Sequence, residues 1–479
     1  MADPRVVVIG AGPAGLATAL SLARRGRPVT VLDRDAAQPV DNPALAYERW
    51  SRPSVPQSPQ PHSLLGRTRR ALRLHAPDVL ASLLEAGAWE NDFGDRLVGE
   101  AAGPADDDLV AVHCRRPVFE CVLRGAVLNE PLATLVSGAT VDGIDLTTVD
   151  GAPRVTGVRV GGATVDADVV VDASGRRSMV PLWLRRSGVS LPTQEVEECG
   201  VVYFSRYFKL REGRDYPSWG GVLGPSGTTD CCRFSMFFGD NGTFAIVLGV
   251  PAWERELKSL KLKDVYMEAV PRFRSLAPFV ADDVAQPITD VLPFGSLQNV
   301  FRPPLLEGAV PVRGLHLVGD AYCHTNPLFA WGLCLGVDHG FELGRIIHEH
   351  ASDVETQSLA FAELTQVEAE HCYHAVADED RDRSLTWRGS QPRGAFLGRS
   401  FAGFVRQCAL PTVMLDAQVA RAVLRRSNLL DSPDALARDD QMLQRVMDLQ
   451  SLIPPPAPGS APDREELLEL VRVQARIGF

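Results

Sequence analysis

The sequence lacks cysteine pairs with the spacing of metal or redox sites. It has nine cysteines, an odd number, and no two of them form a Cys-x-x-Cys motif. Such a pattern offers no ligand set for zinc or an iron–sulfur cluster, and it is typical of a reducing compartment. His348, His350, His371 and His374 also lack a firm metal-ligand geometry. From these absences we expect no metal site and a cytoplasmic location.

The sequence also lacks long apolar runs and basic stripes. No run approaches the ~20 apolar residues that span a membrane, and no secretion signal precedes the first apolar run, which begins after Arg5. A net charge of −11 without a basic stripe argues against a nucleic-acid partner. With 479 residues, 45% of them hydrophobic and 23% charged, the composition is that of a soluble protein of two or three packed units.

The first forty residues carry the clearest pattern. A β-branched run that ends at Ile9 predicts a buried parallel strand, and residues 16–25 predict a helix capped by Gly26. The turn between them is Gly10-Ala11-Gly12-Pro13-Ala14-Gly15. In the dinucleotide-binding motif the first glycine permits the tight turn, the second lets a pyrophosphate approach, and the third lets the helix lie close to the strand.

An acidic residue stands at the expected place after this turn. Asp33 ends the second strand, 18 residues after Gly15, near the offset of a carboxylate that accepts from ribose hydroxyls. A carboxylate there disfavours a 2′-phosphate. The bound dinucleotide should therefore be FAD or NAD rather than NADP.

Two later segments end strands in polar turns. The run 168–171 predicts a strand that leads into Ala173-Ser174-Gly175. The run 315–318 predicts another, followed by Gly319-Asp320, a proline loop and a helix. The carboxyl edge of parallel strands is where open α/β folds bind ligands, so we expect these turns and the Gly10–Gly15 turn to meet there.

The remaining pattern is coarser. We expect a proline-rich loop over 38–61, a helix over 64–84, another around 114–124, and a small antiparallel meander over 139–165. Strands over 201–208, 233–238 and 243–250, the last two joined by a hairpin turn at 240–242, predict a second sheet. Its phenylalanines at 204, 208, 234, 238 and 244 are expected in a core rather than in a pocket.

Helical patterns dominate the last part of the chain. We expect helices over 253–279 and 333–350, and a chain that stays helical to about residue 449. After a proline run at 454–458, Asp463 and Glu466 form a capping box for a last amphipathic helix over 464–477. The acidic face of that helix favours docking on the protein body over contact with a membrane.

The three polar turns together resemble those of FAD-dependent monooxygenases of the glutathione-reductase structural class, which includes aromatic hydroxylases and polyether-forming epoxidases. The resemblance covers roughly residues 4–178 and 290–350. It implies an α/β fold: a Rossmann-like FAD-binding domain of three-layer ββα architecture, interleaved with an antiparallel-sheet substrate domain and followed by a C-terminal helical region. The implied boundaries of the FAD-binding domain are 1–185 and 291–350. The substrate domain comprises 186–290 and a part near 76–112 that is inserted in the first segment of the FAD-binding domain. The helical region comprises 351–479.

The resemblance also implies which residues hold FAD. Asp33 should bind the adenosine ribose, Arg116 should reach the phosphate or ribityl region, and Asp320 should bind a ribityl hydroxyl. The pyrophosphate should lie among the first glycines, and the isoalloxazine ring should face Pro327 and the amides near Gly332. The full implied set is Gly10, Gly12, Pro13, Ala14, Gly15, Asp33, Arg34, Arg116, Val141, Ala173, Gly175, Gly319, Asp320, Pro327, Gly332 and Leu333.

Two departures from the family pattern bear on partners. Where the family has Ala-Asp-Gly, this chain has Ala-Ser-Gly, with the acid displaced to Asp172. That motif is tied to direct use of a nicotinamide, so the electron source is left as NAD(P)H or a separate flavin reductase. Gln57 and His62 match the epoxidase-like branch, but Pro59 stands where that branch often has arginine.

The function implied is a monooxygenase. Reduced flavin would combine with O₂ as a C4a-hydroperoxide and insert one oxygen atom into a small apolar organic substrate, by epoxidation or hydroxylation, in specialised metabolism. The alternatives are an FAD-dependent reductase or dehydrogenase of alkenes, and a flavin-binding protein without catalysis. No catalytic residue is assigned: His62 and His324 are either general acid–base groups or hydrogen-bonded structural histidines.

Overall fold

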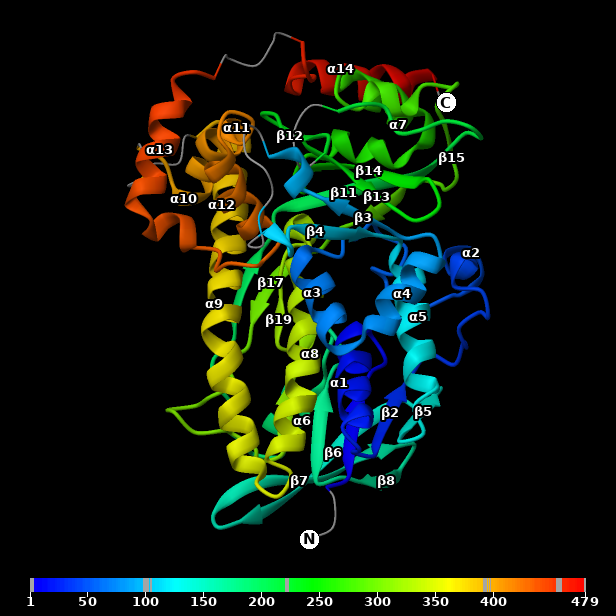
Figure 1. Cartoon of the computed structure of the whole chain (residues 1–479), viewed down its shortest axis with the longest axis vertical. Coiled ribbons are helices and arrows are strands. Elements are labelled where there is room, and N and C mark those ends of the chain that lie inside the picture. The colour runs from blue at the N-terminus through cyan, green and yellow to red at the C-terminus, as the bar shows by residue number, and fades with distance from the viewer. Residues whose placement is uncertain are drawn as a thin grey trace.

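The parallel sheet predicted from the first strand forms the lower half of the molecule in Figure 1. The computed structural model describes residues 4–97, 103, 106–219, 224–390, 394, 396, 398–453 and 459–477. Five parallel strands lie in the order β18-β9-β1-β2-β5. Their bounds are β1 Val6–Ile9, β2 Val29–Asp33, β5 Ala133–Ser137, β9 Val169–Asp172 and β18 Leu315–Leu317.

The alternation of side chains along β1 explains the layers on both faces of this sheet. Val6 and Val8 point into a core shared with three helices, whereas Val7 and Ile9 point into a core shared with an antiparallel meander. The helices are α1 Pro13–Arg24, α5 Arg116–Leu128 and α8 Trp331–Glu349, and the meander is β6 Val141–Val149, β7 Ala152–Val160 and β8 Ala163–Asp166. The expected three-layer ββα architecture is confirmed.

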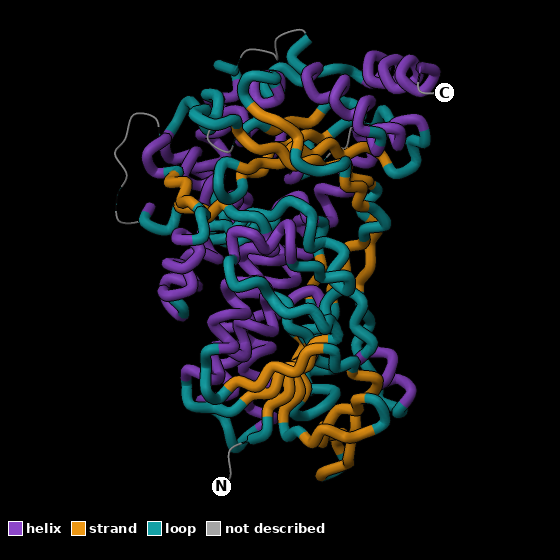
Figure 2. The backbone as a smooth tube through the Cα atoms, turned by 90° about the vertical axis from the view of Figure 1, so that its right-hand side faces the viewer, coloured by secondary structure: helices purple, strands orange, loops and turns teal. Residues whose placement is uncertain are grey.

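A second, antiparallel sheet lies at the end of the molecule opposite the N-terminus (Figure 2). Its order is β12-β13-β14-β11-β15, with β16 also paired to β11. The hairpin predicted at 240–242 joins β13 to β14. The strands are β11 Val201–Leu210, β12 Ser226–Thr228, β13 Arg233–Phe238, β14 Thr243–Pro251, β15 Ala285–Pro287 and β16 Leu292–Phe294.

One face of the second sheet is a hydrophobic core, as expected from its phenylalanines. Phe204, Phe208, Phe234, Phe238 and Phe244 are all buried in one cluster with residues of α7 Lys263–Ala269 and α14 Arg464–Ile477. Leu467 and Val471 of α14 belong to this cluster, so the last helix docks on the protein body as predicted.

The capping box of α14 is also confirmed. The Glu466 amide donates to Asp463 Oδ1 at 2.9 Å, and the Asp463 amide donates to Glu466 Oε2 at 3.1 Å. The proline run 454–458 that precedes it in the sequence lies outside the described residues.

Two expected helices and one expected loop are wrong in detail, each near a proline. The helix expected over 64–84 is two helices, α3 Gly66–His75 and α4 Pro77–Glu85, because proline begins a helix but disfavours one in the residue before it. The stretch 253–279 is broken into α7 and three 3₁₀ turns, two of which begin around Pro271 and Pro278. The loop expected over 38–61 contains a short helix, α2 Ala46–Arg49, just after Pro43.

The C-terminal region begins with the longest helix, α9 Val354–Trp387, which runs along the left side of Figure 1. We expected the chain to stay helical to about residue 449. Beyond α9 it instead forms several short helices separated by other structure. These are α10 Phe401–Phe404, α11 Leu410–Thr412, α12 Ala417–Ser427 and α13 Asp440–Gln450. The smaller elements elsewhere are β3 Trp89–Asp92, β4 Val110–His113, α6 Val180–Arg186, β10 Glu195–Glu198, β17 Gln298–Phe301 and β19 Cys323–His324. The domain boundaries implied by the resemblance stay a prediction.

All nine cysteines are buried and free. Among the described residues, no helix combines the length and the apolar character needed to cross a bilayer.

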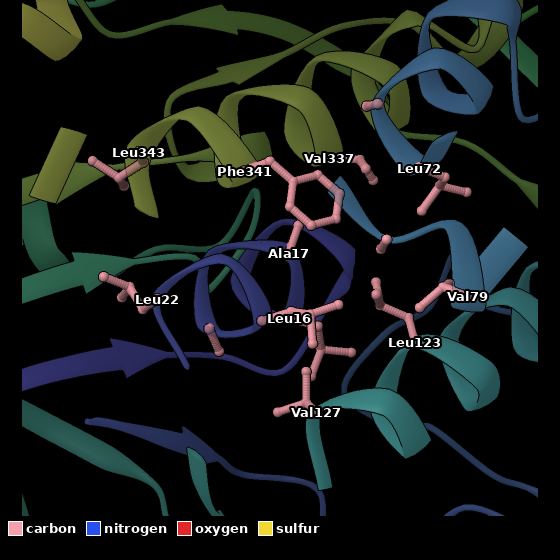
Figure 3. Close-up of a cluster of buried hydrophobic side chains, with 14 of the residues drawn as sticks. Leu16, Ala17, Leu22, Leu72, Val79, Leu123, Val127, Val337, Phe341 and Leu343 are labelled. Carbon is pink, nitrogen blue, oxygen red and sulfur yellow. The ribbon is translucent and has the colours of Figure 1, made fainter. Parts of the chain in front are cut away.

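Helices α1 and α8 pack against each other at short range. Figure 3 shows Ala17 of α1 against Phe341 of α8, with Leu16 below them. The contact depends on glycine: a Cβ added to Gly340 would lie 2.6 Å from the Ala14 carbonyl oxygen, and one added to Gly344 would lie 2.5 Å from Ser21 Cβ. Because α1 follows the first polar turn and α8 follows the third, this packing holds the two turns together.

We expect Gly340→Ala to lower the free energy of unfolding by ~1–3 kcal/mol, because the methyl group would force the two helices apart. Urea unfolding of the purified protein measures this. Gly125→Ala in α5 is the matched control, since a Cβ there meets no atom within 4 Å. Removing glycine from that helix should leave stability unchanged or raise it by ~0.5–1 kcal/mol. Equal effects of the two substitutions would contradict the proposed role of the α1–α8 contact.

Candidate functional site

The three polar turns meet at one edge of the parallel sheet. Gly12 follows β1, Gly175 follows β9 and Asp320 follows β18, and these are neighbouring parallel strands, so their carboxyl ends lie side by side. A cavity of about 240 Å³ lies there. Every residue of the implied FAD-binding set lines this cavity except Gly15.

The space around each glycine explains why Gly12 lines the cavity and Gly15 does not. A Cβ added to Gly12 meets nothing within 4 Å, so its backbone is open to a ligand. A Cβ added to Gly15 would lie 2.1 Å from the Gly10 carbonyl oxygen, so Gly15 packs helix against turn and does not face the cavity. Gly10 has φ of +103°, which only glycine adopts without strain.

Two helix N-termini point their free amides at the cavity. α1 begins at Pro13 and α8 at Trp331, and neither N-cap residue, Gly12 or Ala330, makes a side-chain capping bond. Unused N–H groups and the positive end of the helix dipole favour negative charge. The first N-terminus suits a pyrophosphate, and the second suits a ring that gains negative charge on reduction.

Asp33 is at the centre of a buried ion-pair cluster. Its Oδ2 accepts from Arg52 Nη2 at 3.0 Å and from Arg124 Nη1 at 2.8 Å. Arg52 also donates to Asp35 at 2.9 Å and to Glu120 at 3.1 Å. This cluster, which sequence reasoning missed because Arg52 lies in an irregular loop, fixes that loop over the cavity. The role of Asp33 toward a ribose stays a prediction.

Arg116 and His62 form a second pair on the cavity wall. Arg116 Nη1 lies 2.9 Å from His62 Nε2, and His62 Nδ1 lies 2.8 Å from the Gln60 carbonyl oxygen. Arginine only donates, so Nε2 accepts and Nδ1 carries the proton. Burial, reinforced by the Arg116 charge, lowers the pKa of His62 to about 3. His62 is therefore neutral with both nitrogens engaged, which favours the structural interpretation over a general acid.

Asp320 and His324 lie together at the third turn. His324 Nδ1 is 3.4 Å from Asp320 Oδ2. Burial acts to raise the pKa of Asp320, but His324, Arg116 and Arg176 outweigh it and hold the pKa below its usual value. The carboxylate is thus ionised and available to accept from a hydroxyl group.

The wall of this cavity fits FAD. It runs from Val141 and Asp33 past Gly12 and Gly319 to Pro327, and Gly12 opens its middle to a pyrophosphate. Thr325 Oγ1 is buried and has no hydrogen-bond partner among the described residues, although the residue lines the cavity. A ligand hydroxyl or carbonyl would satisfy it.

The displaced acid of the second motif does not face this cavity. Asp172 is fully buried, and it accepts hydrogen bonds from the Ser174 amide and hydroxyl and from the Ser178 hydroxyl. Burial raises the pKa of Asp172, against the opposing effect of these hydroxyls. Asp172 therefore stabilises the turn at Gly175.

A buried polar network, which the sequence did not indicate, supports the loop at Pro327. Asn326 Oδ1 accepts from Tyr203 Oη at 2.7 Å, and Asn326 Nδ2 donates to Asp380 of α9 at 2.7 Å. Asn299 accepts from the Asn326 amide at 2.6 Å and donates to Asp380 at 2.8 Å. The network joins the second sheet, the third turn and the C-terminal region, so a correct Pro327 loop requires all three.

Two further cavities continue from the FAD cavity. A small one of about 60 Å³ shares Gln57, His62, Phe294 and Pro327 with it. That small cavity shares Leu328 and β13 residues with a larger one of about 210 Å³ between the second sheet and the C-terminal helices. Of the predicted core phenylalanines, Phe238 also lines this larger cavity.

Comparison with known proteins supports an FAD-dependent oxidoreductase. The family model described as DAO, FAD dependent oxidoreductase, matches residues 5–79. The matched segment contains the first polar turn and Asp33. The cofactor is FAD, as the resemblance of the three polar turns implied; the first turn and Asp33 alone left FAD or NAD open. The predicted resemblance to FAD-dependent monooxygenases is consistent with the structures below.

One relative matches most of the chain. Protein Rv3254 of Mycobacterium tuberculosis (strain ATCC 25618 / H37Rv) is 29% identical over 446 residues, 89% of this chain and 90% of that protein.

Three solved structures share the fold. CmlS, a flavin-dependent halogenase, aligns with a TM-score of 0.60 at 20% identity over 91% of this chain and 78% of its own. CabE, an aromatic hydroxylase from angucycline biosynthesis, aligns at 0.55 and 19% identity over 90% and 77%. PqsL of Pseudomonas aeruginosa, a probable FAD-dependent monooxygenase, aligns at 0.54 and 14% identity over 81% and 98%.

We expect Asp320→Asn to weaken FAD binding by about 10-fold or more, because a charged acceptor of a ligand hydroxyl contributes ~1.5–3 kcal/mol. The measurement is the FAD stoichiometry of the purified protein and titration of apoprotein with FAD. Asp215→Asn, an exposed aspartate outside the cavity wall, is the control with the same charge change. An Asp320→Asn protein that purifies with unchanged FAD content would contradict the placement of the third motif.

Proposed function

We propose that this enzyme is an FAD-dependent monooxygenase that inserts one oxygen atom from O₂ into an apolar organic substrate, by epoxidation or hydroxylation. The observation that carries the proposal is the continuity of the FAD cavity with a second cavity at the Pro327 end. That end is where the resemblance places the reactive ring. The substrate would reach the ring through this second cavity.

The larger cavity suits an apolar substrate. Phe237 on β13 and Leu328 and Phe329 of the Pro327 loop line it, as do Phe401 and Val405 of the C-terminal region. Two packed units therefore enclose the space: the second sheet on one side and the helices that follow α9 on the other.

An enclosed apolar site also serves oxygen transfer. When bound, FAD supplies the electron transfer and the activation of O₂. The chain has to keep water from the reacting atoms and stabilise negative charge on the ring. Phe237, Phe294 and Leu328 exclude water at the junction of the cavities, and the N-terminus of α8 supplies the positive dipole.

The electron donor is either NAD(P)H or reduced flavin from a separate reductase. Asp172, which stands in for the family's acid at the second motif, is bonded to its own turn and does not line the FAD cavity. This arrangement favours a separate reductase, and a cytoplasmic location in specialised metabolism would be consistent with such a partner.

The proposal is tested by anaerobic reduction of the FAD-loaded enzyme and rapid mixing with O₂. We expect a transient absorbance spectrum that differs from those of oxidised and reduced flavin, because a dry site slows release of hydrogen peroxide. Reduced free FAD, which has no protein shell, is the control. Reoxidation in one step with one equivalent of peroxide would instead favour the alkene reductase or dehydrogenase, and absence of bound FAD would exclude both enzymes.

We further expect Phe237→Ala to shorten the lifetime of that transient about 10-fold and to raise the yield of peroxide, since removal of the ring widens the junction of the cavities to water. Stopped-flow absorbance and a peroxide assay measure the two effects. Leu359→Ala, which removes an exposed apolar side chain of α9, is the control. An unchanged lifetime in Phe237→Ala would show that this ring does not keep the site dry.

A further inference from the structure

The wall of the larger cavity is not purely apolar. It carries Arg233 of β13, Arg406 and Arg426 of the C-terminal region, and the carboxylates of Asp378 and Glu379 of α9. Charged groups are costly to bury unless each finds a partner. Which of them are paired therefore indicates what the cavity binds.

Each of the two carboxylates already has an arginine partner. Glu379 Oε1 accepts from Arg406 Nη1 at 2.8 Å, and Arg406 also pairs with Asp382. Asp378 is exposed and pairs with Arg381, which lies outside the cavity wall. Neither carboxylate forms a salt bridge with Arg233 or Arg426.

Arg233 has few partners of its own. Its Nη1 donates to Thr228 Oγ1 at 3.0 Å, its Nε is buried without a hydrogen bond, and no carboxylate of the described chain lies within salt-bridge distance. The guanidinium carries five N–H donors and prefers a planar, two-oxygen acceptor. Burial lowers the pKa of Arg233, with Glu379 acting against that effect, as expected for a cation that lacks a close counter-ion.

Arg426 adds a second cation to the same wall. It is 6% exposed, lies over the rings of Trp331 and Phe401 at 5.3 and 5.8 Å, and donates from Nε to the Pro433 carbonyl at 2.8 Å. It too has no carboxylate partner among the residues that the structure describes. The wall of this cavity therefore carries two arginines that form no salt bridge with a described carboxylate, although the chain as a whole carries a net charge of −11.

The position of Arg233 relates this charge to the reaction. Arg233 lines both the larger cavity and the small one that continues to the FAD cavity. A group bound to its guanidinium would lie at the junction, with the rest of the molecule among Phe237, Leu328 and the residues of the FAD cavity.

We propose that the substrate is an apolar acid and that Arg233 binds its carboxylate. This inference rests on the proposed function, which makes the larger cavity the substrate site. It changes the expected substrate from a wholly apolar molecule to an apolar molecule with one anionic group. Arg233 sets the orientation of the substrate, and the carbon that is oxidised is the one placed toward the Pro327 end when the carboxylate is held.

The test measures binding of matched acids and amides to the oxidised, FAD-loaded enzyme by isothermal titration calorimetry. The probes are benzoate, 2-naphthoate and decanoate, each paired with its neutral amide. We expect at least one acid to bind about 10-fold or more tightly than its amide, and Arg233→Gln to remove that preference while it changes amide binding less than 2-fold. Arg233→Lys should retain part of the preference, because it keeps the charge but loses the planar donor set.

Arg185→Gln is the matched control, since Arg185 is exposed and lines neither cavity. FAD content and unfolding temperature check that the variants fold, and Arg233→Lys carries the test if Arg233→Gln does not. The inference is overturned if no acid binds wild type more tightly than its amide, or if the preference survives in Arg233→Gln or Arg233→Lys undiminished.

This measurement needs no reduction and no O₂, so it separates the two proposals. If acids bind more tightly than amides through Arg233 but the reduced enzyme reoxidises without a transient, the anion site stands and the monooxygenase is rejected. If the transient forms but acids have no advantage over amides, the monooxygenase stands and the acid substrate is rejected.

Discussion

The structure depends on the close approach of α1 and α8. Gly336, Gly340 and Gly344 recur every four residues on one face of α8, so the two backbones meet with almost no side chain between them. The helices begin at the first and third polar turns, and the contact therefore fixes the distance between the segment predicted to face a pyrophosphate and the segment predicted to face the ring. A wider contact would separate the two halves of the FAD site.

Buried charges hold the other walls of that site. Arg52 alone pairs with Asp33, Asp35 and Glu120, and all four side chains are almost completely excluded from water. Removal of one partner from such a cluster leaves a buried charge, which is far more costly than the pair is favourable. The cluster thus determines one path for the irregular loop around Arg52, and with it the position of His62 against Arg116.

The part of the molecule next to the Pro327 loop is held differently, by hydrogen bonds between amide, hydroxyl and carboxylate side chains of distant segments. Asp380 of α9 accepts hydrogen bonds from Asn299 and Asn326, and Asn326 in turn accepts one from Tyr203 of the second sheet. The Pro327 loop is consequently shaped by the C-terminal region as much as by the strand that precedes it. The cavities beyond the loop exist only where these parts meet.

The sequence by itself determined the features that depend on neighbouring residues. The strand, glycine turn and helix at Val6–Arg24, the meander, the hairpin at Asp240–Gly242 and the capping box at Asp463 all follow from local pattern. The choice of FAD over NAD came from the resemblance of three polar turns to those of FAD-dependent monooxygenases. Local pattern failed where prolines such as Pro77 and Pro271 divide helical runs.

Only the tertiary structure decided which charges lack partners and which cavities connect. The roles of Arg52, Asp380 and Arg233 do not follow from the local pattern around them. They come from residues more than fifteen positions away or from the absence of a nearby carboxylate among the described residues. Pairing across the fold is set by packing of whole elements, and a one-dimensional pattern does not contain that information.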